Sequence, residues 1–290
     1  MKKNIFRKVA FHNYVQHPDE GACYGVIKCL YGEPKSILRI SARDDAALQK
    51  AVKDGYTLVD VGGGQFDHHS IAARNNIYHN GVIKSAFGLV LERAVVDGKL
   101  SEFELSYVLQ HGGYALQAAD NGQDFEGVVS PFEYIHWLNA SNVADDDKQM
   151  EQFLIAGEIA VNIFSSMLES AKKALPDHET FVNKASIMEN HIVDLPHYMP
   201  TAVEEAQSWN ETHKIKIYFF TFPGSDGNYR IQAVNKIASF ALLKELPHKG
   251  LRNEDLNEAA AITDGVFVHP NGFIASARSL ESCKAIGLQA

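Results

Sequence analysis

Cysteine is scarce in this sequence, and its scarcity argues against a disulfide framework. The 290 residues include three cysteines, Cys23, Cys29 and Cys283. An odd count in a chain without secretory signals indicates reduced thiols, as in the cytosol. Cys23 and Cys29 lie six residues apart on an expected helix, so their side chains face different directions and form no metal-binding pattern. We therefore expect a cytoplasmic protein.

Long apolar runs are also missing. No stretch is long enough to span a bilayer, so we expect no membrane segment and no membrane partner. The start is basic, at Lys2 and Lys3, but Val-Ala-Phe-His-Asn follows in place of an apolar core, and no signal peptide is expected.

Positive charge is in deficit as well. The 27 Lys and Arg residues are outnumbered by 36 Asp and Glu residues, which gives a formal net charge of −9. This balance argues against a protein that coats DNA through phosphate contacts, because such a surface should be basic. It leaves open an enzyme that takes a nucleotide or a strand end into one local basic pocket. With 46% hydrophobic residues, the chain can bury the core of one large domain or two ordinary ones.

Strand and helix patterns alternate in the first part of the chain. Strands are predicted at residues 8–11, 36–41 and 57–61, and helices at 21–31 and 44–54. This order implies parallel strands joined by right-handed crossovers. The loops after the first and third strands should therefore open at the same edge of the sheet.

The middle of the chain has helical spacing. Helices are predicted at residues 85–96, 102–118, 130–138 and 149–175, and Pro176 should stop the last of them.

Strand patterns return near the C-terminus, around clusters of turn residues. The pattern predicts a hairpin from residues 215–222 and 229–234, a strand pair from 265–268 and 272–275, and a closing helix at 279–288. The change in pattern places a domain boundary between about residues 176 and 212.

One glycine-rich stretch carries unusual polar residues. Asp60 interrupts the apolar residues of the third predicted strand, and a buried carboxylate needs a cation or several donors as its partner. The glycines at 62–64 allow a sharp turn and a close backbone approach. Asp67, His68 and His69 then offer one hard oxygen and two imidazoles at the carboxyl end of a strand, where open α/β sheets bind ligands. The alternative is a turn with an Asp and solvent-facing histidines.

Three further candidate ligands follow the first predicted strand. His12, His17 and Asp19 lie on a single loop between that strand and the next helix. In the alternative reading Asp19 caps the helix and the histidines are surface residues. Asp120 precedes Asn-Gly, and on its own it reads as a simple helix end.

Taken together, these motifs resemble the DHH phosphoesterase superfamily, and within it the branch of metal-dependent hydrolases named after melanocyte-proliferating gene one. The residues that carry the resemblance in the first part are His12-x4-His17-x-Asp19-Glu20, Val59-Asp60-Val61-Gly62-Gly63, Asp67-His68-His69 and Ala119-Asp120-Asn121-Gly122. The C-terminal signals are Tyr229-Arg-Ile-Gln-Ala-Val, Gly250-Leu-Arg252 and Phe267-Val-His269-Pro-Asn-Gly-Phe273-Ile. The resemblance runs nearly end to end. It implies an α/β fold, in which a parallel-sheet catalytic domain with a helical insertion (1–190) precedes a smaller α+β substrate-binding cap (191–290).

The resemblance also implies roles for individual residues at a two-metal site. Asp60 would bridge both ions, His12 and His17 would complete the first site, and Asp19, His68 and Asp120 would hold the second. Asp67 and His69 would be the catalytic, substrate-facing groups, and Glu20 would orient its neighbours. Carboxylate and imidazole ligands without thiolate suit Mn²⁺, with Mg²⁺ or Zn²⁺ as other occupants.

In the predicted cap, Arg230, Arg252, His269 and Arg278 are the candidate substrate contacts. Relatives often have Gly-Gly-His where this chain has Ala275-Ser276-Ala277, and Arg278 directly after it is a candidate replacement contact for phosphate. For Arg230, a surface ion pair is an equally good reading.

The function implied is a divalent-metal-dependent phosphodiesterase, acting as a 3′–5′ exonuclease on RNA or short oligonucleotides. One alternative is a hydrolase of a small nucleotide, which the acidic net charge favours. Another is a non-catalytic metal- or nucleotide-binding regulator, which the missing Gly-Gly-His motivates. The expected partners are the nucleic-acid or nucleotide substrate and a second copy of the chain as a homodimer.

Overall fold

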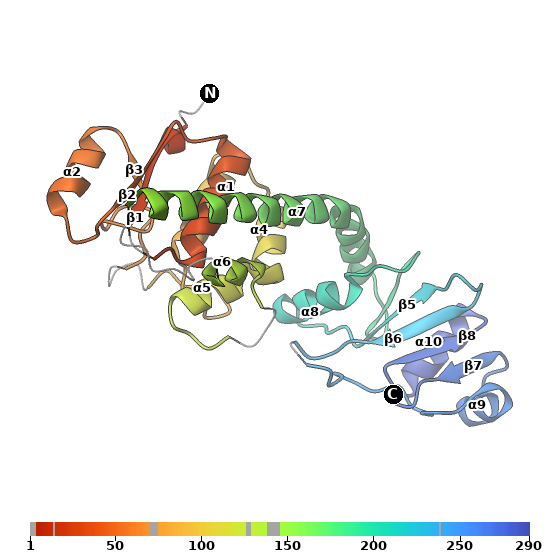
Figure 1. The fold of residues 1–290 in the computed structure, drawn as a ribbon. Helices are drawn as coiled ribbons and strands as arrows, with labels where there is room; N and C mark the ends of the chain where they lie inside the picture. Colours follow the sequence, from red (N-terminus) through yellow and green to blue (C-terminus); the bar gives the residue numbers. More distant parts are fainter. Residues whose placement is uncertain (1–3, 14, 70–74, 126–128, 138–145, 238) are drawn as a thin grey trace. The chain divides into compact units, whose positions relative to one another are not determined.

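The protein is described here from a computed structural model, in which it forms two compact units, Met1–Lys172 and Lys173–Ala290 (Figure 1). The structure describes residues 4–13, 15–69, 75–125, 129–137, 146–237 and 239–290. The resemblance implied a domain boundary after residue 190, and the two compact units divide after Lys172. The roles of catalytic domain and cap stay predictions.

The first unit is built on a small parallel sheet. Its strands are β1 (Lys8–His12), β2 (Ser36–Ile40) and β3 (Thr57–Leu58), in the order β2-β1-β3. Lys8 pairs with Ser36 in one parallel ladder, and Val9 pairs with Thr57 in the other. The predicted parallel pairing is therefore present, and β1 and β3 lead into loops at the same edge.

The third strand is shorter than the sequence predicted. It ends at Leu58. The backbone N–H of Val59 still donates to the Ala10 carbonyl at 2.9 Å, and Val59 forms an isolated bridge to Phe66. Asp60 has a φ of 57°, which lies in the left-handed region and takes the chain out of the extended conformation. Its backbone N–H donates to the carbonyl of Phe66 at 2.9 Å, so this bond closes a loop instead of continuing the sheet.

Helices surround this sheet and form most of the first unit. They are α1 (Pro18–Tyr31), α2 (Asp45–Lys53), α3 (Ala86–Val96), α4 (Glu102–Val108), α5 (Tyr114–Asp120) and α6 (Tyr134–Trp137), with short 3₁₀ turns at Ile5–Arg7 and Pro131–Glu133. The helix predicted at 102–118 is divided by a π turn at Leu109–Gly113, where Gly112 has a φ of 124°. The helix predicted at 130–138 is represented by a 3₁₀ turn and α6, and residue 138 lies outside the described residues.

The longest helix, α7 (Asp146–Ser186), corrects the predicted stop at Pro176, because it continues through that residue. A proline in a helix removes one N–H donor and strains one turn. The cost is outweighed by packing beyond the proline, where Phe181 and Ala185 are buried in the core of the second unit. Thr180 Oγ1 also donates to the carbonyl of Pro176 at 2.8 Å.

By length and composition alone, α7 is apolar enough to cross a membrane, contrary to the expectation from the sequence. Its apolar residues have another role, however. Phe153, Ala156, Ala160 and Phe164 recur at helical spacing and pack in the core of the first unit. The same test is passed by core helices of soluble proteins, so it is weak evidence for a membrane segment.

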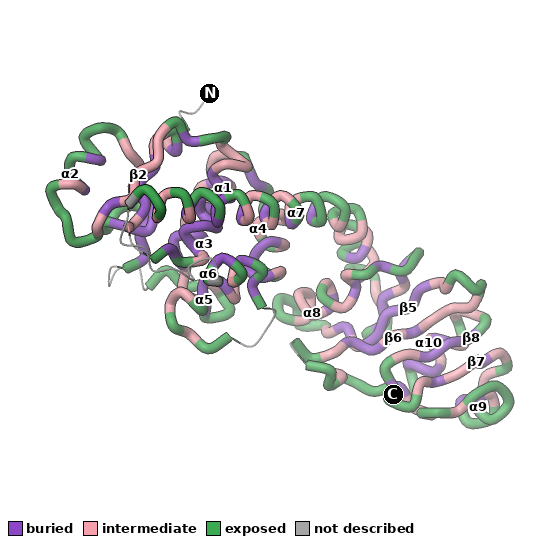
Figure 2. The backbone as a smooth tube through the Cα atoms, viewed as in Figure 1, coloured by how far each residue is buried: buried purple, intermediate pink, exposed green. Residues whose placement is uncertain are grey.

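The second unit is an α+β structure with a five-stranded sheet. Its strands are β4 (Ile192–Asp194), β5 (Phe219–Pro223), β6 (Tyr229–Ala233), β7 (Gly265–Val268) and β8 (Ile274–Ala277), in the order β4-β5-β6-β8-β7, and its helices are α8 (Ala202–Thr212), α9 (Asn253–Ala260) and α10 (Leu280–Leu288). The predicted hairpin, strand pair and closing helix are all present, whereas β4, α8 and α9 were not predicted. Figure 2 shows buried residues along β5 and β6. With its parallel sheet, helical insertion and second α+β unit, the chain has the predicted α/β class.

Candidate metal centre

The loop between β1 and α1 supplies the first group of potential ligands. His12 is the last residue of β1, and His17 directly precedes the first turn of α1. Asp19 and Glu20 lie in that first turn, where negative charge is stabilised by the free N–H groups of the helix. The rings of His12 and His17 are 4.9 Å apart between centroids. A short strand-to-helix loop thus gathers two imidazoles and two carboxylates.

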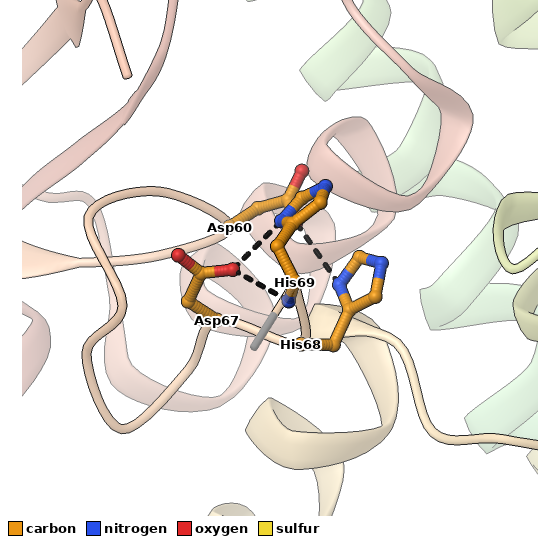
Figure 3. A group of neighbouring side chains, drawn as sticks. All are labelled: Asp60, Asp67, His68 and His69. Atoms are coloured by element: carbon orange, nitrogen blue, oxygen red, sulfur yellow. Dashed lines mark hydrogen bonds and ion pairs between the residues drawn. The ribbon is translucent and has the colours of Figure 1, made fainter. Parts of the chain in front are cut away.

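The loop after β3 supplies the second group, drawn in Figure 3. Gly62 and Gly63 have φ values of 76° and 68°, which allow the tight turn that brings Asp67 back toward the loop. Asp67 Oδ2 accepts from the Gly63 N–H at 2.6 Å. Its Oδ1 accepts from the backbone N–H of His69 at 3.0 Å and contacts His69 Nδ1 at 2.7 Å (Figure 3). Asp67 therefore fixes the loop and holds the His69 ring at its Nδ1 atom.

His68 links two carboxylates that are 60 residues apart in the sequence. Its Nδ1 lies 3.1 Å from Asp60 Oδ1, and its Nε2 lies 2.9 Å from Asp120 Oδ2. Asp120 is the last residue of α5, three residues after Gln117, which is fully buried. The Gln117 side chain accepts from the Ser85 N–H at 3.2 Å and donates to the Gly113 carbonyl at 3.0 Å, and this anchors the end of α5.

Within the described part of the chain, the potential metal donors form three groups that share members, and the donor atoms of each group lie within 4.8 Å of one another. These groups are Asp60-Asp67-His68-His69, His12-His17-Asp60 and His17-Asp19-Asp120. Asp60 and His17 each belong to two groups, so all three join into one cluster. All six residues proposed as ligands, and both proposed catalytic residues, lie in this cluster. Which of them binds an ion, and in which role, stays a prediction.

Two carboxylates of the cluster, Asp19 and Asp60, are buried without hydrogen-bond donors, from the residues that the structure describes, that would stabilise their charge. Asp19 is 0% exposed and Asp60 is 2% exposed. Among the described residues, none offers hydrogen-bond geometry to any of their four carboxylate oxygens. His68 Nδ1 lies 3.1 Å from Asp60 Oδ1 as an ion-pair contact. Buried, unsatisfied carboxylates are costly, and a divalent ion would satisfy them. The acidic and histidine groups can therefore bind metal ions.

Like charges crowd the same space and shift the pKa values of the carboxyl groups. Burial and the negative charges of Asp60 and Asp120 raise the pKa of Asp19 well above its usual value. Burial also raises the pKa of Asp60, and a contact with His68 only partly opposes this. Crowded carboxylates favour protonation unless a cation compensates their charge, so protons and metal ions should compete for this cluster.

The pKa values of two histidines in the cluster are also raised, but here the cause is attraction to neighbouring carboxylates, which stabilises the protonated ring. Burial lowers the pKa of His68, but its contacts with Asp120 and Asp60 outweigh burial and raise the pKa to about 10. Burial likewise lowers the pKa of His12, while the contact with Glu20 and its charge raise it to about 9. For Asp67, burial is outweighed by the contacts with His69 and Gly63, which bring its pKa to about 2.

Comparison with known proteins adds family membership to this geometry. The family model MYG1_exonuc, described as an uncharacterised protein family (UPF0160), matches residues 113–290, which is more than half of the chain. The chain belongs to the MYG1 family. A MYG1 protein of Caenorhabditis elegans is 24% identical over 331 residues, covering 97% of this chain and 94% of the relative. A MYG1 protein of Dictyostelium discoideum is 26% identical over 322 residues, covering 97% and 95%.

A solved structure is also similar, though weakly. The pGpG-specific phosphodiesterase PggH of Vibrio cholerae is 12% identical, covers 97% of this chain and 96% of its own, and has a TM-score of 0.30. At this TM-score the likeness supports no inference about fold or activity.

In this MYG1 protein, two of the predicted substrate contacts have partners on the second sheet. Arg230 Nη2 forms an ion pair with Asp226 Oδ2 at 2.7 Å, and its Nη1 donates to Ser276 Oγ at 2.6 Å. These contacts favour the interpretation that Arg230 forms a surface ion pair. The exposed Arg252 has its guanidinium 5.8 Å from the ring centroid of Phe267.

The other two predicted contacts lie at the ends of β7 and β8. His269 is half-buried and its ring lies 4.4 Å from that of Phe273. Arg278 is exposed, and its backbone N–H donates to the Asp264 carbonyl at 3.0 Å. Contact of any of the four residues with a substrate stays a prediction.

The three residues that stand in place of the expected Gly-Gly-His have a structural role in this MYG1 protein. Ala275, Ser276 and Ala277 are all buried on β8. Ser276 Oγ accepts from Arg230 and donates to the Tyr229 carbonyl at 3.0 Å. The serine therefore ties β8 to the arginine of the neighbouring strand.

One residue of the site escaped the sequence reasoning. Arg39 lies on β2, and its side chain is 6% exposed beside Glu20. A cation in the middle of the apolar strand Ser-Ile-Leu-Arg-Ile-Ser was the available signal, because a buried arginine requires a carboxylate partner.

Proposed function

We propose that this MYG1 protein is a divalent-metal-dependent phosphodiesterase. The observation that carries the proposal is the joined cluster of buried carboxylates and imidazoles, in which Asp60 is shared by two donor groups. Shared carboxylates are typical of sites that hold two ions roughly 3.5–4 Å apart. His12 and His17 would hold the first ion with Asp60, and Asp19, His68 and Asp120 would hold the second.

Bound divalent ions would supply an activated hydroxide and neutralise charge on the phosphoryl oxygens. The chain's own residues would orient the substrate and move protons. Asp67 holds Nδ1 of His69, which leaves Nε2 as the ring atom able to meet a substrate. The His69 side chain is 59% exposed, so a substrate can reach it. The contact with Asp67 raises the pKa of His69 and favours its protonated form. His69 therefore suits the general acid that protonates the leaving oxygen.

The finer proposal is a Mn²⁺-dependent 3′–5′ exonuclease that acts on RNA or short oligonucleotides. The exonuclease label in the family model's name supports it. A small-nucleotide hydrolase is a second candidate, favoured by the net charge of −9, which suits long polyanions poorly.

The test is turnover by the full-length protein after metal removal and addition of Mn²⁺, with a 5′-labelled RNA and a dinucleotide as substrates. Stepwise shortening of the RNA from its 3′ end supports the exonuclease, and turnover of the dinucleotide alone supports the small-nucleotide hydrolase. If neither is cleaved at any Mn²⁺ concentration and one is bound tightly, the protein is a non-catalytic regulator. An Asp67→Asn, His69→Gln variant is the matched control, because it should keep the proposed ligands and lose turnover.

A further inference from the structure

The second strand carries a buried arginine that the proposed reaction does not use. Arg39 pairs with Phe11 in the register of the parallel sheet, next to the strand end that presents His12. Its side chain is 6% exposed, and its guanidinium lies 4.5 Å from the ring centroid of Phe153. A cation buried against an aromatic ring is stable only when a carboxylate compensates the lost hydration.

That carboxylate belongs to Glu20, which is itself fully buried. Arg39 Nη1 lies 3.7 Å from Glu20 Oε1, and the Glu20 side chain is 0% exposed. Glu20 is outside the three groups of potential metal donors. It therefore brings a negative charge close to the metal centre without serving as a donor there, and Arg39 balances that charge from the side of the sheet.

The second oxygen of Glu20 contacts both histidines of the first motif. Glu20 Oε2 lies 2.9 Å from His12 Nε2 and accepts from the backbone N–H of His17 at 2.9 Å. His12 Nδ1 contacts the carbonyl of Asn13 at 2.7 Å, which fixes the ring from its other side. One carboxylate thus sets the rotation of the His12 ring and the backbone at the start of α1, where Asp19 follows.

We propose that Arg39 is a positioning residue for the metal centre. Through Glu20 it holds His12 and His17 in the arrangement that receives the first ion. The planar guanidinium suits this task because it can stack on Phe153 and point toward a carboxylate at the same time, which a lysine ammonium cannot do. The inference rests on the proposed function only in that the cluster binds divalent ions, and it does not require hydrolysis.

The test is calorimetric titration of metal-free, full-length protein with Mn²⁺. Arg39→Met keeps an unbranched apolar stem and removes the charged guanidinium. It should weaken the tighter of the binding events by about 10–100-fold, the usual effect of losing a residue that orients a metal ligand. Arg39→Lys should fall between Arg39→Met and wild type. Arg43→Met is the matched control, because Arg43 is exposed just beyond the same strand. The Mn²⁺ affinity of this variant should equal that of wild type.

A second pair of variants tests whether Arg39 acts through Glu20. Glu20→Gln and Arg39→Met/Glu20→Gln should agree in Mn²⁺ affinity within about twofold, because the carboxylate through which the arginine acts has been removed. The double variant leaves neither an unpaired arginine nor an unpaired carboxylate buried. If either single variant fails to fold, the double variant is compared with wild type instead, and wild-type Mn²⁺ affinity in the double variant overturns the positioning role.

The outcomes separate this inference from the proposed function. Wild-type affinity in Arg39→Met, or a further tenfold loss in the double variant beyond Glu20→Gln, overturns the positioning role. Wild type that binds Mn²⁺ but cleaves no phosphodiester overturns only the proposed reaction. Wild type that binds no divalent ion overturns both.

Discussion

At the scale of single residues, the metal centre is governed by which neighbours compensate its buried charges. Asp60 and Asp19 are buried among other carboxylates, whereas Asp67 is satisfied by Gly63 and His69. The same residue type thus has a raised pKa in one place and a lowered pKa a few ångströms away, as local charge and hydrogen bonding require. Asp19 and Asp60, whose pKa values are raised, should bind metal. Asp67, whose pKa is lowered, should remain a hydrogen-bond acceptor.

His68 is the imidazole whose removal should have the clearest effect. It contacts Asp60 and Asp120 at once, so His68→Ala should abolish hydrolysis and weaken binding of the second ion. His197→Ala is the matched control, because His197 pairs with Asp177 on the surface of the second unit. Elemental analysis and turnover measured on the same preparations check the prediction, and full activity in His68→Ala would contradict it.

The affinity for metal should rise with pH. In the metal-free protein, the pKa values of His12 and His68 lie at about 9 and about 10, so both rings carry a proton at neutral pH that an ion must displace. Raising the pH toward these values removes this competition, so the affinity should increase throughout the range from pH 6 to 9. Titrations with Mg²⁺ from pH 6 to 9 in buffers of different ionisation enthalpy should show proton release. Affinity that does not change with pH would mean that neither ring is a ligand.

At the scale of elements, the site depends on how closely α1 packs against α7. A side chain at Gly25 would place its Cβ 2.8 Å from the backbone of Ala160, and one at Gly157 would lie 2.3 Å from the ring of Tyr24. Both glycines permit the close approach of the two helices. His17 directly precedes α1 and Asp19 lies in its first turn, so this packing fixes the position of two candidate ligands.

Gly25→Ala should therefore destabilise the first unit. Backbone atoms of α7 cannot move aside as a flexible side chain would, and overpacking of this kind costs about 1–3 kcal/mol. Ser170→Ala, on the exposed side of α7, should change the free energy of unfolding by less than about 0.5 kcal/mol. Urea unfolding of the metal-free proteins measures both, and equal midpoints for Gly25→Ala and wild type would show that the helices can separate at little cost.

The elements also show what could be predicted from the sequence. Apolar runs with regular turn signals located β1, β2, α1 and the β5–β6 hairpin, because their patterns agree with their burial. The end of β3 could not be located, since Asp60 leaves the strand through a positive φ that depends on a bond to Phe66.

Other elements were missed because tertiary packing overrides local preference. Pro176 signals a helix end, but the buried Phe181 beyond it keeps α7 helical. The short β4 has only three residues and gains its pairing from β5. The candidate ligands were found because acids and imidazoles at strand ends are unusual, whereas Arg39 acts through a partner 19 residues earlier, which no local pattern reveals.

At the scale of the whole molecule, family membership and the metal centre rest on different parts of the chain. The family match covers residues 113–290, which include Asp120 and all of the second unit. The motifs from His12 to His69 precede that stretch, but the MYG1 relatives align over 97% of the chain. We therefore predict metal binding by residues of the first unit and substrate contact by residues of the second unit.

For the second unit, Arg278 is the residue that should affect substrate and leave metal unchanged. A charge-assisted bond to phosphate contributes about 1.5–3 kcal/mol, so Arg278→Ala should lower kcat/KM by roughly ten- to a hundredfold with metal content unchanged. Arg230→Ala should instead act on stability, because Asp226 and Ser276 already occupy its guanidinium. Steady-state kinetics on a short RNA and a dinucleotide check this, and unchanged kinetics in Arg278→Ala would transfer the role to Arg252 or His269.

The central claim is that Asp60 is shared between two bound ions, and the number of Mn²⁺ ions per chain in Asp60→Asn tests it most directly. Asparagine keeps the size of the side chain and removes the charge that both donor groups use. Elemental analysis after Mn²⁺ loading and desalting should find close to two ions per chain in wild type and close to none in Asp60→Asn. Two ions in both proteins would contradict the account.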